Sequence, residues 1–469
     1  MRFFRILVLL AAIGAAHVAK PQPDPVWNGP YTIHGVVIEG TRATKDGVIL
    51  RELTLAEGDT VASAEQLNAM IERSRQNVFN LGLFHSVEIM PLYLSSTDVF
   101  LTITVVERWA WRPSPIFRYS DPNFNTWWLT RELRRVYYGL YLSRLNMRGR
   151  NETLFLKAQL GYTKEFGIRY RFPYISRRQR WGLAFGGSRT HQDEITAGTR
   201  GNKREFITLH GRETRREWKG DVEVTYRPIL DVRHAFRLGY IHADVMDSVA
   251  RAVPGYFADG GRSADIFTLG YSWTHDRRDR RAFPLKGSLL LLRADRYGLP
   301  IIGDGRTDLT TFYGMAQRIW RTSDRWSLGA GLHGKVSTGP DLPYYLQQGL
   351  GYGDHVRGYE YYVIDGAHYA LLKTNALWAL VKPREYLFAR GEEGRVRRLY
   401  VAIYLNAFAD VGYVWDKRYA ERNPLANAVQ AGYGLGVDLV TNFDMVVRAE
   451  CAVNGLEETG FFLHFAHPF

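Results

Sequence analysis

Two short motifs, far apart in the sequence, contain the residues with the clearest chemical use. They are Val356-Arg357-Gly358-Tyr359, in a glycine-rich stretch, and Phe408-Ala409-Asp410-Val411-Gly412. A guanidinium and a carboxylate form a strong, bidentate pair when the geometry is good and water is excluded. We therefore expect Arg357, on a loop folded into a lumen, to pair with Asp410 on the surrounding wall.

The segment around Asp410 alternates as a β-strand with one apolar face. From residue 401 to residue 412 every odd position is apolar, whereas the even positions include Asp410 and Gly412. Side chains of a strand alternate between its two faces, so Asp410 is predicted to point to the polar side. An Arg-Gly pair alone carries little weight, because it also occurs at residues 148–149, 200–201 and 390–391.

At these motifs the sequence resembles the BamA/TamA superfamily of outer-membrane assembly and secretion barrels. Loop six of that superfamily carries Val-Arg-Gly followed by Tyr or Phe, and its barrel wall carries Phe-x-Asp-x-Gly. A third segment resembles its Asp-x-Arg-Asp hairpin, in which proline and glycine shape a turn between long strands. The matching residues here are Asp276, Arg278, Asp279, Pro284 and Gly287.

The C-terminal segment is an apolar, aromatic strand of the kind that closes bacterial outer-membrane barrels. Its alternating apolar residues are Phe461, Leu463, Phe465 and the terminal Phe469. Pro468 departs from this pattern because it removes a ladder donor, and His467 interrupts the apolar row. The resemblance implies a weak seam between the first and last strands, where a client strand could pair.

The N-terminus indicates export. Two arginines precede an apolar run at residues 6–16, which is shorter than the roughly 20 residues of a spanning helix. We expect a cleaved signal peptide at residues 1–19, with cleavage after Ala16 or Ala19. The proline-rich residues 20–30 are then predicted to be a linker.

Residues 31–108 are predicted to form a small α+β domain. Ser63 and Gln66 make a capping box for one of its helices. The predicted elements are a strand at residues 33–39, helices at 44–53 and from Ser63, and strands at 86–94 and 98–106. This order, with Leu81-Gly82-Leu83-Phe84 and Val105-Val106-Glu107-Arg108, is similar to a single POTRA domain. Such a domain leaves a sheet edge open, to which an extended client can add a strand.

Residues 109–469 alternate in polarity almost throughout, and aromatic residues make up 14% of the chain. No apolar run after residue 16 is long enough for a spanning helix, so the pattern favours a transmembrane β-barrel over a soluble periplasmic β-protein. At about 22 residues per strand, the barrel would have about sixteen antiparallel strands. The predicted fold is thus an all-β barrel with one N-terminal POTRA-like domain.

Motifs of common enzymes are absent from the sequence. There is no P-loop, no Gly-x-Ser-x-Gly elbow and no His-Glu-x-x-His. The 13 histidines do not fall at metal-ligand spacing, and we expect His464 and His467 to be interfacial strand residues. The single Cys451 shares the apolar face of its segment. We therefore expect no enzymatic activity, no cofactor and no metal.

The net charge of +13 is compatible with acidic partners. Because export removes nucleic acid as a partner, the remaining candidates are acidic lipid head groups or lipopolysaccharide phosphates. The resemblance implies an outer-membrane assembly or translocation factor whose POTRA-like domain lies in the periplasm. Its clients would be nascent outer-membrane or secreted proteins, captured at the POTRA edge and the barrel seam, with periplasmic accessory proteins as further partners.

Three other functions remain open at this stage. A dedicated exporter of the two-partner type usually has two POTRA domains and a plug helix, for which a linker of about ten residues is too short. A passive pore would conduct without a client. A barrel lipase would need a Ser-His-Asn set on adjacent strands, of which we find no convincing arrangement.

Overall fold

The computed structural model describes most of the chain from residue 29 onward. The described residues are 29–119, 136–208, 214–253, 256–257, 260–299, 303, 307–339, 346, 348–390, 396–417, 420–441 and 445–466. The expected signal peptide, most of the linker, His467, Pro468 and Phe469 lie outside these ranges. The side chain of Phe465 is also outside them, although its backbone belongs to the last strand.

The N-terminal domain is a four-stranded sheet with one long helix. Its elements are β1 (Tyr31–Glu39), α2 (Asp46–Leu50), β2 (Thr60–Val61), α3 (Ala64–Phe79), β3 (Phe84–Tyr93) and β4 (Asp98–Glu107). The sheet order is β2-β1-β4-β3, with β1 parallel to β4. As the capping box predicts, the Ser63 side chain accepts a hydrogen bond from the Gln66 N–H at the start of α3.

The first helix is shorter than predicted, because the residues before it are held by other partners. The N–H groups of Ala43 and Thr44 donate to the Glu107 carboxylate, and the Lys45 N–H donates to the Gly149 carbonyl. Burial would raise the pKa of Glu107, but hydrogen bonds from Thr44 and from these main-chain groups hold it below its ordinary value. Glu107, at the end of β4, therefore fixes the entry to α2.

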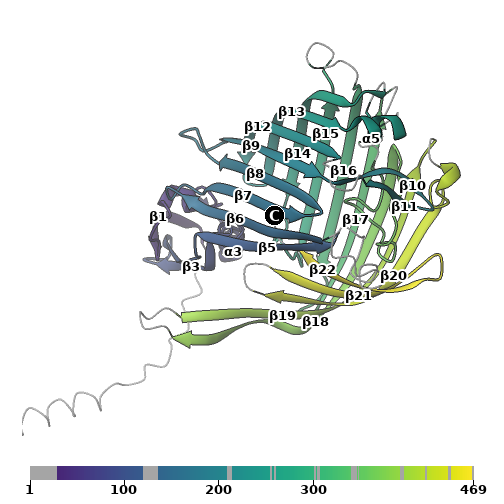
Figure 1. Ribbon diagram of the computed structural model, residues 1–469. Helices are drawn as coiled ribbons and strands as arrows, with labels where there is room; N and C mark the ends of the chain where they lie inside the picture. The colour runs from purple at the N-terminus through teal and green to yellow at the C-terminus, as the bar shows by residue number, and fades with distance from the viewer. Residues whose placement is uncertain are drawn as a thin grey trace, which may run out of the picture.

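Most of the described residues from 111 onward belong to one antiparallel sheet of 16 strands, which confirms the predicted barrel (Figure 1). Its strands are β5 (Trp111–Tyr119), β6 (Val136–Met147), β7 (Glu152–Gly161), β8 (Thr163–Phe172), β9 (Trp181–Gln192), β12 (Arg215–Ile229), β13 (Val232–Val245), β14 (Ser263–Asp276), β15 (Gly287–Tyr297), β16 (Leu309–Arg321), β17 (Trp326–Thr338), β18 (His368–Arg390), β19 (Val396–Trp415), β20 (Val429–Thr441), β21 (Val446–Asn454) and β22 (Thr459–Ala466). Each strand pairs with the next one in this series, and β5 and β22 are the two ends.

In the described residues, a hairpin, a short helix and a 3-10 turn lie between strands of this series. The hairpin of β10 (Glu194–Arg200) and β11 (Lys203–Thr208) is inserted between β9 and β12 and forms its own two-stranded sheet. The short helix α5 (Asp247–Ala252) follows β13, and a 3-10 turn, η4 (Ala420–Arg422), follows β19. The strand pattern did not predict this hairpin as separate from the barrel wall.

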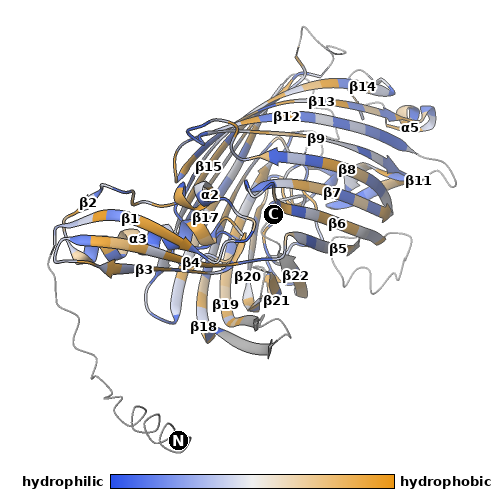
Figure 2. Cartoon of the chain, turned by 90° about the vertical axis from the view of Figure 1, so that its left-hand side faces the viewer, coloured by the Kyte–Doolittle hydropathy of each residue, from blue (hydrophilic) through white to orange (hydrophobic). Residues whose placement is uncertain are grey.

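The outer face of the barrel is apolar. Large apolar side chains are exposed on strand after strand, among them Ile168 on β8, Leu238 on β13, Leu332 on β17 and Leu435 on β20. The hydropathy colours alternate along these strands in Figure 2. Exposed apolar surface on this scale is typical of a face that meets lipid. Among the described residues, no helix combines the length and apolarity needed to cross a membrane.

The N-terminal domain contacts the turns at one end of the barrel. Glu52 forms a two-pronged ion pair with Arg227 on β12, at 2.5 and 2.8 Å. Arg73 of α3 reaches Asp231, in the turn between β12 and β13, at 2.5 Å. The apolar core of the domain also includes Leu145 of β6 and Tyr174, which follows β8. The domain and the barrel therefore share a packed interface at this end.

Replacing Glu52 with alanine is expected to loosen this interface. The Glu52 side chain is buried, and its loss leaves the Arg227 guanidinium with only the Leu230 carbonyl as an acceptor. Breaking a buried ion pair costs about 3–5 kcal/mol, and we expect the lower end because Arg227 is partly exposed. The free energy of unfolding and protease sensitivity between domain and barrel would report the change.

A matched control is Arg75→Ala, which breaks the exposed pair of Arg75 with Glu72 within α3. An exposed pair of this kind contributes about 0–1 kcal/mol. Equal losses in Glu52→Ala and Arg75→Ala would contradict a stabilising role for the interface pair.

Candidate functional site

The connection between β17 and β18 folds inward, against the barrel wall. We call residues 348–367 of this connection loop six. A backbone bridge between Leu350 and Ile364 closes the loop on itself. Val356 and Tyr359 pack with both residues and with Val414 of β19 in one buried cluster. Loop six is therefore an ordered part of the barrel interior.

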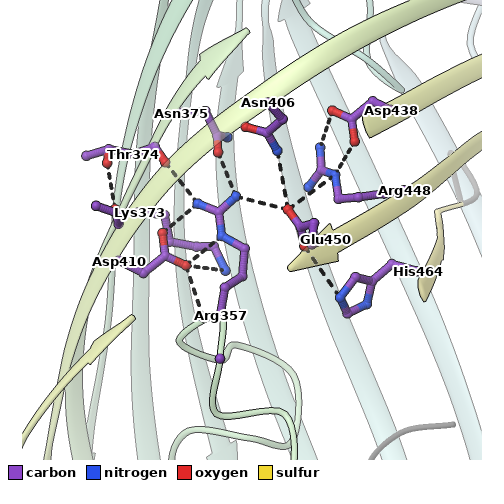
Figure 3. Close-up of polar contacts among 12 residues, drawn as sticks. Arg357, Lys373, Thr374, Asn375, Asn406, Asp410, Asp438, Arg448, Glu450 and His464 are labelled. Atoms are coloured by element: carbon purple, nitrogen blue, oxygen red, sulfur yellow. Dashed lines mark hydrogen bonds and ion pairs between the residues drawn. The ribbon is translucent and has the colours of Figure 1, made fainter. Parts of the chain in front are cut away.

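Arg357, in the middle of loop six, is completely enclosed by acceptors (Figure 3). Its Nη2 lies 2.6 Å from Asp410 Oδ1, and its Nε lies 2.8 Å from Asp410 Oδ2. The other three guanidinium N–H groups donate to Asn375 Oδ1 at 2.7 Å, to the Thr374 carbonyl at 2.9 Å and, more weakly, to Glu450 Oε1 at 3.5 Å. The side chains are 3% and 0% exposed, so this is the bidentate, desolvated geometry in which such a pair is strongest.

The other two residues of the wall motif also serve loop six. The Arg357 guanidinium lies over the Phe408 ring, 3.9 Å from its centroid, as a cation–π contact. At Gly412 a Cβ would lie 2.6 Å from Val356 Cγ2, so only glycine lets the loop approach this closely. On the neighbouring strand, a Cβ at Gly432 would collide with the Arg357 carbonyl. Phe408, Asp410 and Gly412 thus form the part of the wall against which loop six packs. We call these three residues the Arg357 seat.

Gly358 and Tyr359 form hydrogen bonds with the end of β21 and with the turn that follows it. Gly358 has a φ of +92°, and its carbonyl accepts from Asn454 Nδ2 at 2.9 Å. The Tyr359 hydroxyl accepts from the Gly455 N–H at 3.1 Å. Loop six is therefore attached to the wall near the last strand as well as to β19.

A charged network continues from Arg357 toward the end of the sheet. Arg357 Nη1 lies 3.5 Å from Glu450 Oε1 on β21, and Lys373 Nζ of β18 lies 3.4 Å from Asp410. Arg448 Nε lies 3.8 Å from Glu450 Oε1 and pairs with Asp438 of β20 at 2.6 Å. His464 of β22 lies 3.5 Å from Glu450 Oε2. The network therefore runs across five consecutive strands, β18 to β22, and ends on the edge strand.

Comparison with known proteins agrees with this architecture. The family model described as the Omp85 superfamily domain matches residues 146–446, well over half of the chain. The chain belongs to the Omp85 superfamily. A POTRA model, described as the surface antigen variable number repeat, matches residues 31–108, so the chain combines an Omp85 barrel with a single POTRA domain.

Two solved structures have a similar fold. BamA from Haemophilus ducreyi lacking POTRA domains 1–3 aligns with a TM-score of 0.53 and 12% identity, over 93% of this chain and 83% of that one. CdiB from Escherichia coli aligns with a TM-score of 0.57 and 13% identity, over 93% of this chain and 76% of that one. At this identity the similarity establishes the fold alone.

Membership has direct consequences for the class of function. Omp85 proteins are non-enzymatic outer-membrane assembly and transport barrels, which confirms the expectation that the protein is not an enzyme. Proteins of this superfamily act on client proteins such as secreted or outer-membrane proteins. Homologous barrels lie in the bacterial outer membrane with their POTRA domains in the periplasm.

The hairpin motif of this Omp85 chain lies away from Arg357, in the turn between β14 and β15. Asp276 and Arg278 form a two-pronged pair at 2.9 Å, and Asp279 Oδ1 accepts from the Leu285 N–H at 3.0 Å. At Gly287, with a φ of +115°, a Cβ would collide with the Arg277 carbonyl. Pro284 lies within the turn that these contacts close. The motif is structural here, and its Asp279 carbonyl also accepts from Asn80 of the POTRA domain.

The last strand divides its residues between two faces. Phe461 and Leu463 are exposed on the outer face, whereas Phe462 is buried and His464 points inward to Glu450. The expectation that His464 is an interfacial residue is therefore wrong. Side chains of a strand alternate between its faces, so His464 lies on the inner face with Phe462, and Phe461 and Leu463 lie on the outer face.

Two functional features were missed by the sequence patterns. The β10–β11 hairpin holds loop six from the side, since Thr199 Oγ1 donates to Asp365 at 2.6 Å and the Val363 N–H donates to the Asn202 carbonyl at 2.9 Å. The second feature is a pair of prolines, Pro113 and Pro115, in the first barrel strand, β5. Proline within a strand is itself a signal for a sheet edge and could have been used.

Proposed function

We propose that this protein inserts client proteins into the bacterial outer membrane through the junction between β5 and β22. One observation carries the proposal. Among the described strands, β5 and β22 pair with a single neighbour each and share no hydrogen-bond ladder, although both views draw them on the same side of the barrel (Figures 1 and 2). An unpaired strand edge in lipid costs several kcal/mol per polar group, so a client strand that pairs with it is favoured without nucleotide.

The prolines of β5 support a weak junction. β5 pairs with β6 without a register shift from Trp111 to Tyr119, although Pro113 and Pro115 have no N–H to donate. Both prolines have the same parity, so their nitrogens face the same edge of the strand. An intact ladder with β6 requires that this edge be the one away from β6. The edge that faces the junction thus lacks two donors, and this weakens any ladder between β5 and β22.

The POTRA domain offers a second edge for an extended client. Among the described strands, β3 pairs only with β4. Met90 and Leu92 near its end are 56% and 57% exposed. An extended peptide can add to such an edge through main-chain hydrogen bonds, with apolar contacts adding affinity. We place this domain in the periplasm, where unfolded clients arrive, with acidic lipid head groups and accessory periplasmic proteins as further partners.

Export of one dedicated partner is the second candidate. Transport through the lumen would take a client past loop six, which Arg357, Val356 and Tyr359 hold against the wall. Insertion at the junction needs no passage past this loop. We rank insertion first because the unpaired edges of β5 and β22 supply a place for a client strand.

The two candidates differ in where the client finishes. The purified protein in liposomes would receive either an unfolded outer-membrane barrel or an unfolded secreted β-rich passenger. Insertion predicts that the barrel client folds into the bilayer faster than in protein-free liposomes, as measured by protease resistance and gel mobility. Passenger protected inside the vesicles, without faster barrel folding, would establish export instead. If neither client responds, the proposed function is wrong.

A further inference from the structure

Two residues of loop six and one residue of the last strand surround a common point inside the barrel. They are His355, Glu360 and His464, and one ligand atom of each lies within 4.8 Å of the other two. His464 Nε2 is 3.7 Å from Glu360 Oε1, and His355 Nε2 is 3.9 Å from the same oxygen. All three atoms are of types that bind divalent transition metals.

Glu360 is the central group of this cluster and is only half satisfied. Its side chain is 6% exposed. Its Oε2 accepts a hydrogen bond from the Gly358 N–H at 2.7 Å, whereas its Oε1 is buried and has no hydrogen-bond partner. The facing His464 Nε2 is likewise buried without a hydrogen bond. A buried polar atom without a hydrogen bond destabilises the folded protein by about 1–3 kcal/mol, and by more when the group is charged. A ligand bound between these two atoms would remove that cost.

We propose that His355, Glu360 and His464 bind a divalent transition metal ion, with Zn²⁺ as the best match to two imidazoles and one carboxylate. Two ligands at about 2.0–2.1 Å from one zinc ion lie at most about 4.2 Å apart, and both distances to Glu360 Oε1 are within that limit. The ligand nitrogens of the two imidazoles lie within 4.8 Å of each other, so they must approach somewhat to bind the same ion. Small rotations of the imidazoles would complete the geometry. The fourth position falls to water or to Glu450, whose Oε2 lies 3.5 Å from His464 Nε2.

The site is accessible to an ion from solution. The side chains of His355 and His464 are each 33% exposed, so rotation of either imidazole can admit an ion, while the carboxylate is enclosed. A competing arrangement is a plain ion pair, with one histidine protonated beside Glu360. The pair would leave the second histidine without a role, and it predicts no metal binding.

The position of the site links loop six to the edge strand. His355 and Glu360 lie on either side of Arg357 in loop six, which packs against the Arg357 seat, and His464 belongs to β22. A bound ion would therefore hold β22 against loop six and oppose movement of that strand. This consequence rests on the proposed function at the β5–β22 junction, whereas metal binding itself does not.

The binding test uses the full-length protein in a Cys451→Ser background, so that the single thiol contributes nothing. After chelation and dialysis, ZnCl₂ would be titrated and bound zinc measured by elemental analysis, with Co²⁺ absorption as a report on the ligand field. We expect one equivalent of zinc. Because losing even an outer partner of a metal ligand costs about 10–100-fold in affinity, Glu360→Gln and His464→Ala should each weaken binding by about 100-fold or more.

The matched control is His242→Ala. His242 forms a histidine–carboxylate pair with Asp265 at 2.7 Å and lies on β13. Its removal should leave zinc binding unchanged, and the β-sheet circular dichroism of every variant should match that of the parent. Zinc bound as tightly by the Glu360→Gln/His464→Ala protein as by the parent, or no zinc bound by the parent, would overturn the proposal.

The effect on β22 has its own readout. If zinc holds the edge strand, adding it to the liposome assay should slow client insertion in the parent and not in Glu360→Gln. Zinc that binds without changing insertion would disprove the role at the junction and leave the metal site intact. Stoichiometric zinc binding by a protein that inserts no client under any condition would contradict the proposed function alone.

Discussion

Arg357→Ala is expected to release loop six and to destroy client handling. The replacement removes the two hydrogen bonds that the guanidinium donates to Asp410. This carboxylate, which is 0% exposed, then keeps only the backbone N–H of residue 357 at 3.2 Å and a 3.4 Å contact to Lys373. Stranding one partner of a buried ion pair costs about 3–5 kcal/mol. Asp410→Ala should cost a similar amount, because it strands the guanidinium instead.

A double-mutant cycle separates this coupling from simple loss of contacts. If the two residues act as a pair, the protein with both replacements should be no worse than either single variant, in the free energy of unfolding and in client insertion. Arg357→Lys should restore little, because lysine lacks the planar fork that reaches Asp410, Asn375 and the Thr374 carbonyl together. Strictly additive losses, or normal insertion by Arg357→Ala, would remove this pair from the mechanism.

The control for this cycle is Arg200→Ala. Arg200 lies on β10 and pairs with Glu205 at 2.6 Å, but both side chains are largely exposed. Its loss should cost no more than about 1 kcal/mol. The comparison therefore tests the effect of burial on an arginine pair that has similar distances.

The barrel and the wall motif were predictable because both rest on local alternation. Asp410 on the inner face and Leu405 or Val411 on the outer face follow from a period of two residues. A strand count near sixteen follows from strand length and turn length. Neither inference requires knowledge of contacts between distant segments.

The remaining features depend on contacts between distant segments. The N-terminal helix α2 is short because Glu107 and Gly149 bind the backbone that precedes it, and periodicity contains no trace of either contact. The grouping of His355 and Glu360 with His464 has no sequence spacing typical of a metal site, since it forms only when loop six folds back to β22. By contrast, Pro113 and Pro115 were readable as edge residues in the sequence.

Locking the junction between β5 and β22 is expected to stop client insertion almost completely while leaving the protein folded. In a Cys451→Ser background, Phe117→Cys on β5 and Leu463→Cys on β22 place thiols on the exposed faces of the two end strands. A disulfide between them, whose formation is checked by the loss of both free thiols, would join the two end strands covalently, and a client strand could no longer enter. Activity should return on reduction.

The chain offers a control that differs only in the position of the link. Cys451 lies directly opposite Phe461 in the ladder of β21 and β22, so Phe461→Cys alone forms a disulfide within the wall. That link joins strands already bonded to each other and should leave insertion unchanged. Because both proteins carry one disulfide on β22, a difference between them isolates the junction from any general effect of oxidation. Full activity in the protein crosslinked between β5 and β22 would exclude lateral opening and would leave passage through the lumen, past loop six, as the route of the client.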